Sequence, residues 1–189
     1  VQGCDAAIFA AARTGGVKVS VETPWVQLTD NVIIDARLMQ ACFDAGIKRW
    51  VYVSTASAYQ AFDDAIAEDE LDWREDPADM HLGIGWVKRY GEKACLFWHK
   101  KAGIDAIILR LSNVYGPNAC FDPQTSNFIP ALVRKAVDKV DPFDVWGSPN
   151  VTRDVLYADD FGAAVIAALS NRQIKFDVFN IGAGRSVSV

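Results

Sequence analysis

The chain alternates short apolar runs with longer segments in which apolar residues recur every three or four positions. The short runs predict strands of a parallel sheet, buried on both faces, and the longer segments predict helices. Strand and helix in alternation are typical of an α/β fold. We expect strands at 6–12, 50–55, 105–111 and 176–181, the last being the final strand, shorter ones at 143–146 and 152–157, and helices at 30–45, 84–102, 128–140 and 159–169.

The first predicted helix illustrates how the pattern sets an element's limits. It begins at Thr29-Asp30, carries an apolar stripe on one face and ends before Gly46. The stripe consists of Val32, Ile33, Ala36, Leu38, Met39 and Cys42. Residues 17–28 contain Pro24 and no clean period, so we expect them to be mostly irregular, with a short helix as the alternative.

Composition places the chain among ordinary globular proteins. Its 189 residues are 51% hydrophobic and 23% charged, which is enough to bury one sizeable core. The net charge of −5 argues against binding to nucleic acid, which needs clustered lysine and arginine. Residues 60–80 are acidic but lack the spacing of a calcium-binding loop, so they predict a surface loop rather than a metal site.

The four cysteines are widely spaced and do not predict a zinc site or a disulfide framework. Cys42 and Cys95 lie in helical apolar patterns and are predicted to be small buried hydrophobes. The chain shows no signal peptide and no run near the ~18 apolar residues that a membrane helix needs. We therefore expect a cytoplasmic protein with no metal and no membrane contact.

Four stretches carry a family resemblance: VYVSTASAY at 51–59, GIGWVKRYGEK at 83–93, LRLSNVYGP at 109–117 and TRDVLYADD at 152–160. Together they resemble the extended short-chain dehydrogenase/reductases, specifically the NAD-dependent nucleotide-sugar epimerases and dehydratases. The similarity runs through nearly the whole chain in the family's order. It implies a Rossmann-like portion at 1–120, a mixed portion at 121–189 with substrate-domain segments interleaved with the sheet, NAD or NADP as cofactor, and a nucleotide-sugar substrate.

The resemblance also implies roles for single residues. Thr55 matches the catalytic Ser/Thr that hydrogen-bonds the reacting oxygen, and Lys88 matches the lysine that holds the nicotinamide ribose. Ala10, Ala11 and Asn31 match positions near the cofactor. Asn113, in a predicted turn at 113–117, and Arg153 match positions that bind the nucleotide-sugar diphosphate, for which an arginine fork is well suited.

Each of these residues also has a purely structural interpretation. Thr55 can satisfy a local backbone group at a strand end. Lys88 can be a solvated helix lysine, and Asn31 can be a first-turn helix residue beside Asp30. Arg153 can pair with Asp154 or with Asp159.

One position departs from the family pattern. In the family, a tyrosine four residues before the helical lysine exchanges the substrate's proton, because positions i and i+4 share a helix face and the ammonium lowers the tyrosine's pKa. That position here is Ile84, which cannot carry a proton. Tyr90 lies about 200° around the helix from Lys88. Tyr59 matches a structural tyrosine of the family, so neither is expected to replace the missing group.

A second departure concerns the cofactor. The sequence contains no Gly-x-Gly-x-x-Gly or Gly-x-x-Gly-x-x-Gly turn of the kind that holds a pyrophosphate. The chain therefore resembles the middle of such an enzyme: a partial Rossmann-like sheet without its first strands, from a truncated gene or a fragment. We expect weak or absent NAD binding.

These observations predict a relative of the nucleotide-sugar epimerases and dehydratases that has little or no turnover. The alternative is a non-catalytic protein that binds nucleotide sugars or forms a dimer. In relatives, the helices that match 30–45 and 84–102 pair across a two-fold axis, so a homodimer is expected through them. Apolar residues on the outward faces of both helices would favour this alternative.

Overall fold

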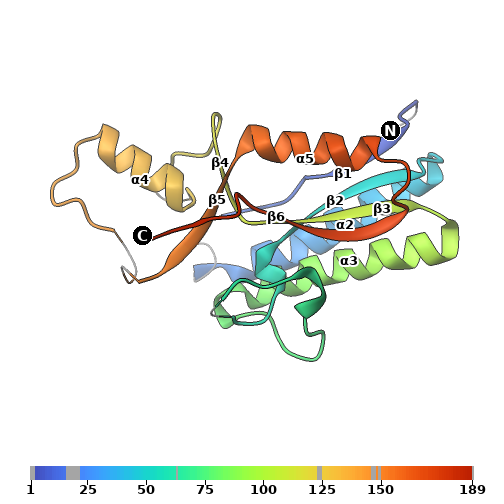
Figure 1. Ribbon diagram of the computed structural model, residues 1–189, viewed down its shortest axis with the longest axis horizontal. Helices are drawn as coiled ribbons and strands as arrows, with labels where there is room; N and C mark the ends of the chain where they lie inside the picture. The colour runs from blue at the N-terminus through green and yellow to red at the C-terminus, as the bar shows by residue number, and fades with distance from the viewer. Residues whose placement is uncertain are drawn as a thin grey trace.

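The computed structural model describes residues 3–15, 22–62, 64–122, 125–145, 148 and 150–188. Its elements form two small sheets and the helices around them (Figure 1). The strands are β1 (Ala6–Phe9), β2 (Arg49–Thr55), β3 (Asp105–Leu111), β4 (Asn113–Tyr115), β5 (Thr152–Tyr157), β6 (Phe176–Ile181) and β7 (Ser186–Ser188). The helices are α2 (Pro24–Asp44), α3 (Leu82–Ala102), α4 (Phe128–Val137) and α5 (Ala158–Ser170), with 3-10 turns η1 (Ala56–Ala58), η2 (Glu68–Glu70) and η3 (Asp79–His81).

The first sheet has the order β1-β2-β3-β6, and all of its neighbouring strands are parallel. Figure 1 shows α2 and α3 side by side on one face of this sheet and α5 on the other. Alternate side chains along the strands therefore enter two separate cores. Trp50, Tyr52 and Ile108 pack on the α2–α3 side, whereas Val51 and Ile107 pack on the α5 side.

The second sheet lies beyond the carboxyl end of β3 and has the order β4-β5-β7. β4 pairs in parallel with β5, and β5 pairs antiparallel with β7. A single residue, Ser112, separates β3 from β4 along the chain. The second sheet therefore continues from the first one where the strands of the first sheet end. Carboxyl ends of parallel strands are where α/β folds usually bind ligands.

The α/β fold with a parallel, helix-flanked sheet is confirmed. Strand 105–111 has the predicted limits, and the long helix ends at Gly103, whose φ of +66° suits glycine as a left-handed cap. Cys42 and Cys95 are buried as predicted. The division at residue 120 stays a prediction.

The prediction for α2 was wrong at its start and for part of its buried face, whereas Met39 and Cys42 of the predicted stripe are buried. The helix begins at Pro24, because proline is favourable in a helix's first turn rather than only in loops. Its buried residues are Gln27, Asn31, Asp35, Met39 and Cys42, while the predicted stripe residue Ile33 is 49% exposed. Polar residues spaced by four therefore face the interior here, which an apolar pattern does not reveal.

The first strand is shorter than predicted and is not buried on both faces. β1 ends at Phe9 and lies at the edge of the described sheet. Phe9 is 3% exposed and faces α2, whereas Ile8 is 49% exposed on the opposite face. The reason is that α5 packs over β2 and leaves Ile8 uncovered.

Four further predictions need correction. The predicted turn at 113–117 contains the strand β4, because the segment pairs with β5. Helix 128–140 ends at Val137. Residues 143–145 form no strand, and Trp146 lies outside the described residues. The strand at 176–181 is followed by β7, so it is not the final one. In the described part of the chain, no helix is both long and apolar enough to cross a membrane.

Candidate functional site

The amino end of α3 is held tightly against the carboxyl end of β2. A Cβ atom on Gly85 would lie 2.5 Å from Pro77 Cβ and 2.6 Å from the Ser57 carbonyl oxygen. Only a glycine permits this approach without displacement. The contact places Ile84 next to the residues that follow β2, which is where a proton carrier from α3 would have to act.

Thr55 ends β2 and caps the short turn that follows. Its Oγ1 accepts a hydrogen bond from the Ser57 backbone N–H at 3.2 Å and lies 3.4 Å from Ser57 Oγ. The side chain is half-buried. The geometry thus gives Thr55 the local backbone role, and its hydroxyl donates to Ser57 Oγ.

Lys88 is buried, with 7% of its surface exposed. Its Nζ donates to the Val53 carbonyl oxygen at 2.9 Å and lies 4.9 Å from the centre of the Tyr52 ring. Burial lowers the pKa of its ammonium, and the charge of Asp35 on α2 counteracts this. Lys88 is therefore no solvated helix lysine, and its ammonium is directed into the protein.

Beneath Lys88 lies a polar contact that the sequence did not predict. The Tyr52 hydroxyl donates to Asp35 Oδ2 at 2.6 Å, and both residues are buried. Gly91 of α3 leaves room for this hydroxyl, since a Cβ there would lie 2.0 Å from it. Burial raises the pKa of Asp35 despite the Tyr52 hydrogen bond and the Lys88 charge. The sequence signal was the four-residue spacing of Gln27, Asn31 and Asp35 along one helix face.

Asn31 holds the loop after β1 in place. Its side chain accepts from the Arg13 backbone N–H at 2.6 Å and donates to the Arg13 carbonyl oxygen at 3.0 Å. Because α2 starts at Pro24, Asn31 lies in the second helical turn and is buried rather than beside a helix start. Ala10 and Ala11 are exposed just before this anchored loop.

Arg153 and Asn113 come from the second sheet. Asn113 Nδ2 donates to the Asp154 carbonyl oxygen at 3.0 Å. The Asp154 carboxylate accepts from Ser112 Oγ, and from the backbone N–H groups of Ala183 and Gly184, at 2.8–3.1 Å. It is thus committed to holding the loop after β6. Arg153 itself makes no hydrogen bond or ion pair with any described residue, to Asp154 or to Asp159.

The tyrosines near the site do not replace the missing one. Tyr59 is 1% exposed, accepts from Arg110 Nη1 at 2.7 Å and donates to Asn180 Oδ1 at 2.7 Å. Arg110 in turn forms a buried ion pair with Glu92 at 2.8 Å. Tyr90 is 43% exposed and so lies on the outer side of α3, away from buried Lys88. A proton carrier must reach hydrogen-bonding distance of the substrate, which neither geometry offers.

Two observations bear on a dinucleotide site. Lys88 Nζ is bound to a backbone carbonyl, and no strand in the described ranges is followed by a glycine-rich turn that opens a helix. Thr55 is half-buried, and Arg153 is an arginine without a hydrogen-bond or ion-pair partner among the described residues.

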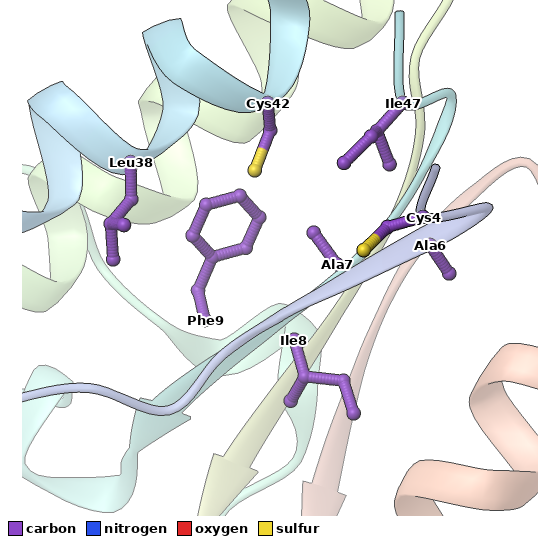
Figure 2. Close-up of a pocket in the computed structure, with 8 residues that line it drawn as sticks. All are labelled: Cys4, Ala6, Ala7, Ile8, Phe9, Leu38, Cys42 and Ile47. Carbon is purple, nitrogen blue, oxygen red and sulfur yellow. The ribbon is translucent and has the colours of Figure 1, made fainter. Parts of the chain in front are cut away.

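A small groove lies away from these residues. It has a volume of about 200 Å³, lies between β1 and α2, and is lined by Cys4, Ala6, Ala7, Ile8, Phe9, Leu38, Cys42 and Ile47. Figure 2 shows Phe9 pointing toward Cys42 and Leu38 of α2, with Ile8 directed the other way. None of the predicted site residues lines it, so we assign it no chemistry.

Comparison with known proteins gives consistent matches. A model described as the NAD dependent epimerase/dehydratase family matches residues 1–182. GDP-L-fucose synthase of Sinorhizobium fredii is 28% identical over 190 residues, which is 97% of this chain and 60% of that protein. UDP-glucuronate 4-epimerase of Thermodesulfobacterium geofontis is 29% identical over 182 residues, 96% of this chain and 52% of that protein.

Solved structures agree with these sequence matches. The structure of MoeE5 in complex with UDP-glucose and NAD has a TM-score of 0.83 and 29% identity, and the match covers 100% of this chain and 60% of that one. UDP-glucuronic acid 4-epimerase from Bacillus cereus, in complex with a fluorinated UDP-glucuronic acid and NAD, has a TM-score of 0.82 and 29% identity over 99% of this chain and 56% of that one. The chain thus spans a little over half the length of these relatives.

Proposed function

The chain belongs to the NAD-dependent epimerase/dehydratase family, and from that premise we propose that it binds a nucleotide sugar but turns it over slowly or not at all. The observation that carries the proposal is Arg153, a half-buried guanidinium without a partner among the described residues, at the carboxyl side of the parallel sheet. Arginine without a carboxylate partner is suited to two phosphate oxygens.

The substrate class follows from the relatives. MoeE5 was solved with UDP-glucose, and the Bacillus cereus epimerase with a UDP-glucuronic acid analogue. We propose that the diphosphate of such a ligand lies against Arg153 and Asn113, with the sugar directed toward Thr55. The Asp154 carboxylate supports this arrangement by fixing the loop after β6 beside both residues.

Slow turnover follows from two features. Ile84 occupies the position where the family places its proton-carrying tyrosine, and an alkyl side chain accepts no proton. Lys88, the family's ribose ligand, has its ammonium on the Val53 carbonyl. We expect that mixing the chain with NAD and UDP-glucose converts none of the sugar nucleotide, as followed by chromatography, and conversion at a rate typical of enzymes, about 1 per second or faster, would contradict this.

Binding is tested by isothermal titration calorimetry with UDP-, GDP- and dTDP-sugars. We expect one class to bind, and Arg153→Ala to weaken it about ten- to a hundredfold, since a hydrogen bond to a charged group contributes about 1.5–3 kcal/mol. Arg172→Ala is the matched control, because Arg172 is an exposed arginine before the amino end of β6. An equal loss of affinity in the two variants, or no binding of any sugar nucleotide, would overturn the proposal.

A second proposal is dimer formation through α2 and α3. Large apolar side chains are exposed on both helices: Trp25, Leu28 and Ile33 on α2, and Leu82, Trp86, Tyr90 and Phe97 on α3. Exposed apolar patches of this kind mark interaction surfaces. The two helices lie side by side on one face of the first sheet, whereas α5 lies on the other.

Sedimentation velocity tests the dimer. We expect Ile33→Arg combined with Phe97→Arg to shift a dimer to monomer, because a charge in an apolar interface is not solvated. Ile166→Arg, at a residue of α5 that is 65% exposed, is the control and should leave the dimer intact. A wild-type chain that stays monomeric at high micromolar concentration would rule the proposal out.

A further inference from the structure

One face of the second sheet is more exposed than the other. Side chains alternate between the two faces along a strand, and residues that pair directly across neighbouring strands point to the same face. The register therefore places six residues on one face: Asn113, Tyr115, Arg153, Val155, Tyr157 and Val187. On this face Tyr157 is 36% and Val187 is 41% exposed, whereas Leu156 on the opposite face is 3% exposed.

Tyr115 of β4 and Tyr157 of β5 form an aromatic pair on this exposed face. They are directly paired in the register, and their ring centroids are 5.5 Å apart with an angle of 65° between the ring planes. This is an edge-to-face arrangement. The edge of one ring lies against a single face of the other ring, so the far face of that second ring is not covered by its partner. The pair therefore offers an aromatic surface at the end of β4 and β5.

The groups of the proposed binding site follow one another in a fixed order along this sheet. Thr55 ends β2, which pairs in register with β3, and β4 begins two residues after the end of β3. Because β4 and β5 are parallel, Asn113 and Arg153 lie toward the end nearest Thr55, and the tyrosine pair lies at the far end. The Cα atoms of Arg153 and Tyr157 are about 13 Å apart, since a strand rises about 3.3 Å per residue.

We propose that Tyr115 and Tyr157 hold the base of the bound nucleotide sugar by stacking. The inference rests on the proposed binding function. A nucleotide sugar carries its groups in the order sugar, diphosphate, ribose and base, and the sheet presents Thr55, then Arg153 and then the tyrosine pair. The ribose lies between the diphosphate and the base, which accounts for the distance between Arg153 and the tyrosines.

Stacking of this kind fixes the nucleotide end of the ligand without selecting one base. Every base has a π face, so an aromatic side chain stacks on uracil and on guanine alike. The exposed face of the sheet contains two aromatic rings and one guanidinium. We therefore expect the tyrosines to supply affinity for the nucleotide, and the choice of base to lie outside this pair.

The test is isothermal titration calorimetry with UDP-glucose and GDP-glucose, which share their sugar and diphosphate and differ only in the base. Tyr157→Leu removes a ring and keeps an apolar side chain, and Tyr115→Leu does the same for its partner. We expect each variant to weaken both ligands about five- to a hundredfold, the range of one base–aromatic stack. Tyr157→Phe keeps the ring and should bind as wild type does.

Trp73→Leu is the matched control for these variants. Trp73 has the same exposed fraction as Tyr157, 36%, but belongs to the loop before α3. Its replacement should leave the affinity for both ligands unchanged. Equal losses of affinity in Trp73→Leu and Tyr157→Leu would contradict a specific role of the tyrosine pair.

Proton NMR of the ligands gives a readout in the wild-type chain, which needs no variant to fold. A base stacked on a tyrosine lies in the shielding region of the ring. We therefore expect H5 and H6 of uracil, and H8 of guanine, to shift upfield on binding, while the anomeric proton of the glucose does not. Saturation of the tyrosine ring protons should also transfer to the base protons.

The two measurements separate this inference from the binding function on which it rests. Suppose that a ligand binds and is weakened by Arg153→Ala, but its base protons do not shift and neither leucine variant loses affinity. The stacking inference is then wrong, and the binding proposal stands. Absence of binding by both ligands to the wild-type chain would instead remove the binding proposal and this inference together.

Discussion

The polar side chains under the first sheet have hydrogen-bond or ion-pair partners within the protein, whereas a key polar side chain at the carboxyl end of the sheet does not. Under the sheet, Asp35, Lys88 and Glu92 are buried and each is bonded to the protein itself. At the carboxyl end, the half-buried Arg153 has no bonded partner among the described residues. Because a buried polar group without a partner costs free energy, the bonds of the first group contribute to stability, and we propose that Arg153 is available to a ligand.

The comparison teaches where family chemistry has been kept. Lys88 remains, but its ammonium serves the Val53 carbonyl, and the position four residues before it holds Ile84. Arg153 remains as well, on a strand whose neighbour Asp154 fixes the adjoining loop. Lys88 is thus engaged within the protein, whereas Arg153 bonds to no described residue.

Removing the charge of Arg110 has the largest expected effect. Arg110 bonds Glu92 through two nitrogens, and also the Tyr59 hydroxyl and the Glu68 carbonyl, so Arg110→Met leaves a buried carboxylate unpaired. We expect a loss of about 3–5 kcal/mol in the free energy of unfolding, measured with urea. A loss in the free energy of unfolding below about 1 kcal/mol, which is typical of an exposed ion pair, would contradict the structural role assigned to the groups under the sheet.

Gly91→Ala tests the packing beneath Lys88. The new methyl group would lie 2.0 Å from the Tyr52 hydroxyl, and that hydroxyl is fixed by Asp35. Overpacking of this kind costs about 1–3 kcal/mol. Tyr52→Phe in the same chain should recover part of the loss, because it removes the fixed oxygen. Additive losses in the double variant would show that the two sites do not touch.

Asp35→Asn tests the buried carboxyl through pH. Its folded pKa lies above the ordinary 3.8, so its contribution to stability is complete below that pH and is lost as pH rises through the folded pKa. The asparagine variant lacks this loss. We therefore expect the stability of Asp35→Asn to increase relative to wild type as pH rises from 4 to 7. A stability difference between the two proteins that stays constant from pH 4 to 7 would contradict the raised pKa of Asp35.

The smallest expected change in stability is that of Arg153→Ala, and it separates the two regions most sharply. Because Arg153 bonds to no described residue, Arg153→Ala should change the free energy of unfolding by no more than about 0.5 kcal/mol, while weakening nucleotide-sugar binding. A large loss of stability would mean that Arg153, like Arg110, belongs to the structural network.

Sequence reasoning found the parallel sheet and the long helix because their apolar runs and glycine caps are local signals. It missed the start of α2, since Pro24 has the same sequence signature in a loop and in a helix's first turn. It placed Ile33 in the apolar stripe and did not single out Asp35, because an acid on α2 that is bonded to a tyrosine of the sheet leaves no apolar pattern. Arg153 was found through its motif at 152–160, because that signal is local in the sequence.

The account is tested most directly by titrating the chain with UDP-glucose and the other sugar nucleotides, with and without NAD. It predicts that a sugar nucleotide binds in the absence of NAD, that NAD alone gives no binding, and that adding NAD leaves the sugar-nucleotide affinity unchanged. Tight binding of NAD alone, or sugar-nucleotide binding that requires NAD, would show that the cofactor side of the site is still open and would contradict the account.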